Sequence, residues 1–271
     1  GDDAVIWRGP LKVNVIKHCD AYYAGGYMVL FGTGRYLATT DIVDSNYQTM
    51  YGIWDYGDEP DEYLGAFNRG SSAAELSNQP GTVSLLEQEI IQWTEVGGNW
   101  LRVLSNYEPD WTKTIDGQPV NHVGWYIDLP LDKERVIRNS TVRDGRLIIL
   151  SSIPSDDPCD AGGDSIVHEI NACTGARLDS PQFDINNDGV IDEYDLLPLL
   201  DASGNPMTDA SGNIIKVPPS GIKFDSMMYP PIILLTPGGI TERKYFSTAA
   251  GSIQTMEERA ERRGVFYWWM R

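Results

Sequence analysis

Short apolar runs rich in Val, Ile, Leu, Tyr and Trp recur along the chain, and each run is bounded by Gly, Pro, Asn or Asp. Runs of this kind between turn-forming residues are typical of β-strands. The pattern therefore predicts a chain built mainly from strands. The predicted strands are Tyr27 to Leu37, Gln48 to Trp54, Trp100 to Leu104, Gly124 to Leu129, Arg146 to Ile153, Ser165 to Ile170 and Pro231 to Thr236, with a less obvious candidate in Val5 to Ile16.

Helical patterns are few and short. The candidates are Ser71 to Leu76, Glu193 to Leu200 and the charged segment Thr255 to Arg263. The apolar spacing of Leu85 to Trp93 suits either a helix face or a buried strand, so its type stays open.

A two-strand unit repeats loosely along the chain. In each unit a hydrophobic strand ending in small residues is followed by a second strand and a turn. The units read V-L-F-G-T-G with M-Y-G-I-W-D, L-I-I-L-S-S with I-V-H-E-I-N-A-C-T-G, and I-I-L-L-T-P with K-Y-F-S-T-A-A-G-S-I. Repeated sheet units are typical of β-propeller blades. We therefore predict an all-β, β-propeller-like fold in a single domain, residues 1–271, that forms part of a propeller.

Residues 183–222 are predicted to form a surface insertion in this domain. Near its end the sequence D-A-S-G-N occurs twice, starting at Asp201 and at Asp209. Each copy contains a Ser-Gly-Asn turn, so a small surface hairpin is favoured over a second binding site.

The insertion begins with the strongest chemical signal in the chain, the run D-I-N-N-D-G-V-I-D-E-Y-D. In EF-hand-type calcium loops, positions 1, 3 and 5 supply side-chain oxygens, position 6 is Gly, position 7 supplies a carbonyl and position 12 a carboxylate. Gly189 holds position 6 here. The predicted Ca²⁺ ligands are Asp184, Asn186, Asp188, Val190 (through its carbonyl), Asp192 and Asp195. The alternative is a solvated turn rich in Asp, Asn and Gly.

Two features bear on the kind of calcium site. Position 12 is Asp195 instead of the usual Glu, as in dockerin-type loops, and no second loop of this kind is present to pair with it. We therefore expect a structural Ca²⁺ in an extracellular setting, with a dissociation constant of about 10⁻⁵ to 10⁻³ M, and not a cytosolic switch.

The three cysteines fit the same setting. Cys159 and Cys173 bracket a stretch that can fold back as a turn and strand, which makes them a disulfide candidate in an oxidising compartment. Two buried free thiols are the alternative. Cys19 is left over. His18, His122 and His168 show no zinc-binding spacing with these cysteines.

Charge and length exclude several function classes. The formal net charge of −18 over 271 residues argues against nucleic acid and acidic membrane surfaces as partners. The longest apolar stretches are far shorter than the roughly 20 residues that span a bilayer, so no membrane-spanning segment is expected. The beginning of the chain does not look like a signal peptide, which favours a mature or excised segment.

Catalytic signatures are not found. The sequence contains no G-x-S-x-G elbow and no H-E-x-x-H, and no Ser/His/Asp set with recognisable local signatures. Two alternatives to a non-enzymatic module remain: a quinone-dependent propeller enzyme, and a carbohydrate-binding surface module using Tyr22, Tyr23, Trp268 and Trp269. The basic cluster Arg259, Arg262, Arg263 and Arg271 is interpreted as balancing neighbouring glutamates.

Several motifs resemble the C-terminal β-propeller of PilY-type proteins, which are tip-associated adhesins and assembly factors of type IV pili. The motifs are V-L-F-G-T-G-R-Y-L from Val29, Asp41, Q-T-M-Y-G-I-W-D from Gln48, G-W-Y-I-D-L-P from Gly124, E-R-V from Glu134, P-S-D-D-P-C-D-A-G-G-D-S from Pro154 and C-T-G from Cys173. Their order matches that of the family, and the resemblance covers roughly residues 29–175.

This resemblance implies the C-terminal part of a propeller at the pilus tip, outside the cell or on its surface. It implies minor pilins or other tip proteins as partners, roles in pilus assembly, extension and retraction or adhesion, and possible contact with a host or abiotic surface. Gly32 and Gly34 are expected to permit close backbone approach, and Arg35 to pair with an acidic neighbour such as Asp41 or Asp55. Trp54 and Trp125 are expected to pack between blades.

Overall fold

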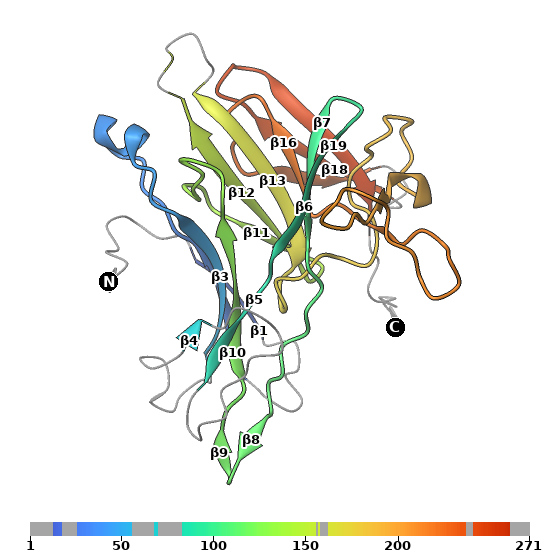
Figure 1. Ribbon diagram of the computed structural model, residues 1–271. Helices are drawn as coiled ribbons and strands as arrows, with labels where there is room; N and C mark the ends of the chain where they lie inside the picture. Colours follow the sequence, from blue (N-terminus) through green and yellow to red (C-terminus); the bar gives the residue numbers. More distant parts are fainter. Residues whose placement is uncertain are drawn as a thin grey trace, which may run out of the picture.

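The computed structural model describes residues 13–17, 26–55, 68–69, 83–155, 157, 162–236 and 241–260. Strands dominate these residues, and the two helical segments, η1 (Thr39–Val43) and η2 (Glu193–Asp195), are short 3₁₀ turns. The all-β prediction is confirmed. Figure 1 shows the strands gathered into sheets, with long connections projecting at both ends.

Two of the sheets have six strands each. Sheet 1 has the order β1 (Asn14–Lys17), β2 (Tyr27–Gly32), β3 (Gln48–Asp55), β10 (His122–Leu129), β5 (Ser84–Glu87) and β4 (Asn68–Arg69). Sheet 2 has the order β11 (Thr141–Arg143), β12 (Arg146–Pro154), β13 (Gly163–Asn171), β16 (Gly221–Phe224), β7 (Asn99–Leu104) and β6 (Ile90–Val96). Both sheets are open, with edge strands on either side.

Sheet 3 has three antiparallel strands, β17 (Ile232–Leu235), β18 (Thr241–Ser247) and β19 (Ile253–Arg259). Two short hairpins complete the described strands: β8 (Thr114–Ile115) with β9 (Gln118–Pro119), and β14 (Leu197–Pro198) with β15 (Lys216–Val217). The three predicted two-strand units are the antiparallel pairs β2–β3, β12–β13 and β17–β18. Each pair lies in a different sheet, as expected for separate blades.

Strands β12 and β13 of sheet 2 are buried on both faces. Alternate side chains of a strand point to opposite faces, so each strand contributes to two clusters. Leu147 and Ile149 of β12 belong to a hydrophobic cluster shared with sheet 1, whereas Ile148 and Leu150 belong to a second cluster that includes Phe246 of sheet 3. A strand buried on both faces reads as a nearly continuous apolar run. This explains why β12 reads as a nearly continuous apolar run in the sequence.

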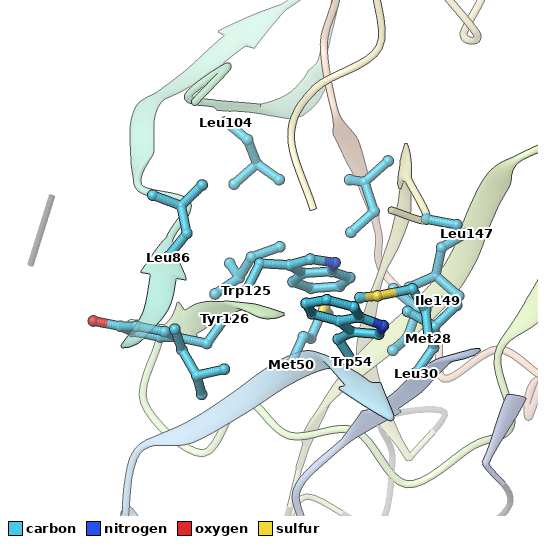
Figure 2. Close-up of a cluster of buried hydrophobic side chains, with 14 of the residues drawn as sticks. Met28, Leu30, Met50, Trp54, Leu86, Leu104, Trp125, Tyr126, Leu147 and Ile149 are labelled. Atoms are coloured by element: carbon cyan, nitrogen blue, oxygen red, sulfur yellow. The ribbon is translucent and has the colours of Figure 1, made fainter. Parts of the chain in front are cut away.

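Trp125 of β10 is the centre of the first cluster, and Figure 2 shows its indole beside Trp54. Both side chains are buried, which confirms the expected packing role. A Cβ added to Gly52 or to Gly175 would lie 2.3 Å and 2.4 Å from the Trp125 ring. The two glycines therefore leave the space that the indole fills.

The turn after β2 holds the predicted ion pair between Arg35 and Asp41. Asp41 accepts hydrogen bonds from the backbone N–H of Leu37 and Ala38 and from Nε of Arg35, at 2.7–2.9 Å. The backbone bond from Leu37, then Arg35, lower the pKa of Asp41 to about 2. A Cβ on Gly32 would lie 2.5 Å from the Val136 side chain, so the expected close approach is confirmed.

Buried ion pairs join the sheets. Arg102 of β7 donates to both carboxylate oxygens of Glu134, at 2.8 and 3.0 Å, and both side chains are buried. Lys244 of β18 contacts the carboxylates of Glu169 and Glu258 between sheets 2 and 3. Such groups tolerate burial only as compensated pairs.

Three helical predictions had different outcomes. The prediction of a helix for Thr255 to Arg263 is wrong, because residues up to Arg259 form β19 and pair with β18. Its charged residues alternate, so that Glu258 is buried against Lys244 while Glu257 is exposed. The segment from Glu193 to Leu200 contains only the single turn η2, followed by β14. Ser71 to Leu76 lies outside the described residues.

The undecided segment Leu85 to Trp93 belongs to two strands, β5 in sheet 1 and β6 in sheet 2. The chain crosses between sheets at Gln88, whose side chain bonds the carbonyls of Tyr107 and Thr174. This crossing explains why neither a single helix nor a single strand fits its apolar spacing.

Candidate calcium loop

The predicted calcium loop, Asp184 to Asp195, lies in the long connection between β13 and β16 that we call the excursion (residues 172–220). In Figure 1 the excursion is coloured from yellow to orange and projects to the right of the sheets. Strand β16, which follows it, lies between β13 and β7 in the middle of sheet 2. The excursion therefore leaves sheet 2 and returns to it.

Side-chain oxygens of the first half of the loop bind the loop's own backbone. Asp184 accepts from the N–H groups of Asp188 (3.2 Å) and Gly189 (2.9 Å). Asn186 Oδ1 also accepts from Asp188 N–H, at 2.9 Å, and Asp188 Oδ1 accepts from Val190 N–H at 2.8 Å. These bonds hold the oxygens of loop positions 1, 3 and 5 within one tight turn.

The turn depends on left-handed backbone at two positions. Asn187 has φ of 60° and Gly189 has φ of 83°. No atom lies within 4 Å of a Cβ built on Gly189, so Gly is favoured there by its backbone conformation and not by lack of space. This is the position at which calcium loops of the EF-hand type place Gly.

Asp195 closes the loop from its other end and is fully buried. Its Oδ1 accepts from Ile185 N–H at 2.8 Å and from Asn186 N–H at 3.4 Å, and its Oδ2 accepts from Asp192 N–H at 2.9 Å. Asp192 in turn caps η2 by accepting from Tyr194 N–H at 2.8 Å. The shorter Asp at position 12 thus ties the beginning of the loop to its end.

The donor set fits a hard cation. All six predicted ligands offer oxygen, which is the ligand type that Ca²⁺ prefers. Each carboxylate oxygen can accept about two hydrogen bonds or ligand bonds. The oxygens of Asp184 and Asp188 accept one hydrogen bond each and keep a position for a ligand bond, whereas Oδ1 of Asp195 already accepts two. In the described part of the chain no three His, Cys, Asp or Glu side chains meet as a metal cluster. The four carboxylates of the loop are therefore not gathered around one point in this conformation, and calcium binding by the loop stays a prediction.

Apolar residues on both sides of the loop anchor it to the core. Phe183 and Ile185 at its start and Leu197 after its end are buried in the second hydrophobic cluster. A Cβ on Gly97, in the β6–β7 turn, would lie 3.6 Å from the Ile185 carbonyl oxygen. The loop conformation thus determines how three core side chains meet sheet 2.

A polar clamp adds to this anchor. The side chain of Gln92 in β6 accepts from Leu200 N–H at 3.0 Å and donates to the Pro198 carbonyl at 3.3 Å. Because β6 is an edge strand, these bonds fix the excursion against the edge of sheet 2. Nothing in the sequence around Gln92 points to this role.

The two D-A-S-G-N copies form matching turns. Oδ1 of Asp201 and Oδ1 of Asp209 each accept from the N–H groups two and four residues later, at 2.8–2.9 Å. The bonds from Asn205 and Asn213 lower the pKa of the respective carboxyl groups. Bridges between Leu200 and Pro206 and between Thr208 and Ile214 close the turns. Their carboxylates serve the turns themselves, in agreement with the predicted surface role.

The remaining predicted residues give a mixed picture. Cys173 is disulfide-bonded. Cys19 and Cys159 lie outside the described residues, so the pairing of Cys159 with Cys173 stays a prediction. His18, the aromatic residues proposed for sugar binding, and Arg262, Arg263 and Arg271 also lie outside them.

A Ser/His/Glu group that the sequence did not suggest lies between β12, β13 and the segment before β11. Ser151 Oγ lies 3.1 Å from His168 Nε2 and donates to Glu134 at 2.5 Å. All three side chains are buried, and Glu134 also binds Arg102. Burial lowers the pKa of His168 well below its ordinary value, with Arg102 contributing. This is a buried structural network, with no exposed nucleophile.

No family model matches the sequence. The type IV pilus biogenesis factor PilY1 of Pseudomonas aeruginosa strain PAO1 is 30% identical over 173 residues, which cover 62% of this chain and 14% of that protein. A PilY1 homolog of Xylella fastidiosa is 29% identical over 171 residues, covering 61% of this chain and 12% of that protein. The chain thus spans a small fraction of the length of these relatives. No described helix is long and apolar enough to cross a membrane.

The crystal structure of the Pseudomonas aeruginosa PilY1 C-terminal domain superimposes with a TM-score of 0.62 at 18% identity. The match covers 92% of this chain and 44% of that domain. It confirms the prediction of an all-β, propeller-like fold, here with open sheets. The chain is therefore similar in sequence to PilY1 over 62% of its length, and it shares the fold of part of the PilY1 C-terminal domain.

Proposed function

We propose that this chain is a non-enzymatic, calcium-stabilised module of a type IV pilus biogenesis factor. The relationship to PilY1 in sequence and fold carries the proposal, because the related proteins are named as pilus biogenesis factors and not as enzymes. The buried state of the Ser151, His168 and Glu134 side chains agrees with a structural role for them.

Calcium has a defined task in this proposal. The ion is held by side-chain oxygens of Asp184, Asn186, Asp188, Asp192 and Asp195 and by the Val190 carbonyl. Its positive charge neutralises part of the negative charge of the loop. The ion stiffens a loop whose ends carry Phe183, Ile185 and Leu197 into the core. It thereby fixes the excursion on sheet 2, and catalysis is not part of its role.

The proposed place of action is the pilus tip, outside the cell or on its surface, where the module contacts minor pilins or other tip proteins. A surface fixed by calcium would then control partner binding in pilus assembly or adhesion. The disulfide at Cys173 and the loop both suit an extracellular compartment.

A pull-down tests the partner claim. The purified chain is immobilised and offered purified minor pilins in 2 mM Ca²⁺, or in EDTA with 2 mM Mg²⁺, beside an Asp188→Ala variant as matched control. Retention of at least one minor pilin by wild type in calcium, and its loss in EDTA and in the variant, is expected. Absence of retention in calcium would contradict the proposed partners, and equal retention in EDTA would contradict calcium control.

A further inference from the structure

A small polar cavity lies at one end of sheet 2, beside the segment that leads into the calcium loop. Its volume is about 170 Å³. It is found where β7 and β13 end and β12 begins, and its walls include Arg146, Asn171 and Arg177. Glu108 and Asp179 also line it, and both are exposed.

Arg177 is the cation of this cavity that forms no salt bridge among the described residues, although the nearby Asp179 favours its charged form. One Nη donates to the Leu104 carbonyl at 3.2 Å, and no ion pair involves Arg177 among the described residues. Its side chain is about half buried, and this loss of water lowers its pKa. A guanidinium in such a place is stabilised by an anion that replaces the lost water.

Two neighbouring groups carry further donors. Asn171 uses its side-chain oxygen to accept from Cys173 N–H (2.9 Å) and Thr174 N–H (3.3 Å), so its NH₂ group remains to donate. Nε of Arg146 is buried and has no hydrogen-bond partner, although Glu242 and Gln182 bind the rest of the guanidinium. This nitrogen has almost no accessible surface, so Asn171 is the further donor that a ligand in the cavity can reach.

We propose that this cavity binds a carboxylate group, with Arg177 as its ion-pair partner and Asn171 as a second donor. A planar carboxylate matches the two parallel donors of a guanidinium. Glu108 and Asp179 disfavour ligands with several negative charges, and the net charge of −18 acts in the same direction. The ligand therefore carries a single carboxylate, either as a small free acid or as an acidic side chain or chain end of a polypeptide.

This proposal does not rest on calcium or on a pilus role. Its test is a titration followed by NMR, with N-acetylglutamate α-amide as the small probe and N-acetylglutamine α-amide as its uncharged counterpart. A hexapeptide Ala-Gly-Ser-Gly-Ala-Glu with an amidated end, whose one acid is a side chain, and its Gln analogue form the polypeptide arm. Saturable shifts that include the Asn171 NH₂ signals are expected for the acids and not for the amides.

Variants assign the binding to the cavity. Arg177→Gln should weaken binding of the acid about tenfold or more, and Arg177→Lys, which keeps the charge, should weaken it less. Lys216→Gln removes an equal charge from an exposed site outside the cavity and should leave binding unchanged. Glu108→Gln should strengthen binding about two- to fivefold, which a merely structural defect would not produce.

Tighter binding of the peptide than of the small acid would identify a polypeptide ligand, and equal binding would identify the carboxylate group alone; both support the site. Absence of saturable binding by either acid would overturn the proposal. Equal losses in Arg177→Gln and Lys216→Gln would overturn it as well. Thermal unfolding midpoints of the variants show that each is folded during the titration.

Discussion

Removing the Asp195 carboxylate should destabilise the protein even when no calcium is present. In Asp195→Ala the N–H groups of Ile185 and Asp192 lose an acceptor that lies 2.8 and 2.9 Å away. Ile185 is buried, so its N–H is left unsatisfied, whereas Asp192 is half-buried and its N–H can reach water. An unsatisfied buried group costs about 1–3 kcal/mol and a lost bond about 1 kcal/mol, so the expected loss is about 2–4 kcal/mol.

Asp188→Ala is the matched comparison. Asp188 lies in the same loop and also accepts a backbone N–H, but it is exposed, so water replaces the lost bond. The expected loss is below about 1 kcal/mol. Asp195→Asn, which keeps one accepting oxygen and the shape of the side chain, should fall between the two.

The assay is urea unfolding in EDTA, followed by tryptophan fluorescence, with the free energy of unfolding compared among the four proteins. Hydrogen exchange of the Ile185 amide adds a local reading, because this amide should exchange faster in Asp195→Ala. If Asp195→Ala and Asp188→Ala lose equal stability, the buried carboxylate does not close the loop, and the reasoning fails.

Three further predictions concern the core. Gly175→Ala should destabilise the protein by about 3 kcal/mol, because the new Cβ would lie 2.4 Å from the buried indole of Trp125 at a φ of +70°. Gly117→Ala has a similar φ of +75° but open space around it, so it should cost about 1–2 kcal/mol. Equal losses of stability in thermal unfolding would contradict the packing argument. His168 stays neutral in the fold but is protonated in the unfolded chain below pH 6.5. The free energy of unfolding should therefore decrease as the pH is lowered below 6.5, by up to about 1.4 kcal/mol per pH unit. In urea unfolding between pH 7 and 5, His168→Gln should remove this part of the pH dependence. Glu134→Ala leaves Arg102 buried and unpaired, so it should destabilise the protein by about 3–5 kcal/mol. Glu257→Ala breaks an exposed pair and should cost less than about 1 kcal/mol. Similar losses of stability in chemical unfolding would count against the buried network.

The strand pairs could be predicted from the sequence because apolar residues in buried strands form continuous runs. This holds for β12 and β13, which are covered on both faces. It fails for β19, where Glu258 and its neighbours read as a charged helix. Its burial depends on Lys244, a partner 14 residues away in sequence, and local periodicity carries no such information.

The candidate calcium site divides in the same way. The spacing of Asp184, Asn186 and Asp188 and the Gly at position 6 are local, so the loop could be recognised from residues alone. The clamp from Gln92 in β6 and the buried position of Asp195 arise from tertiary packing and could not. The cavity at Arg177 is also a product of three distant segments meeting at the end of sheet 2.

Calorimetric titration of Ca²⁺ into the wild-type chain, Asp184→Ala and Asp188→Ala tests the central claim most directly. The wild type should bind one ion with a dissociation constant of about 10⁻⁵ to 10⁻³ M. At a hundredfold excess of calcium over that constant its stability should rise by about 2.7 kcal/mol. Both variants should lose the heat and the stabilisation. Equal heats in all three proteins, or none in the wild type, would contradict a calcium-fixed excursion.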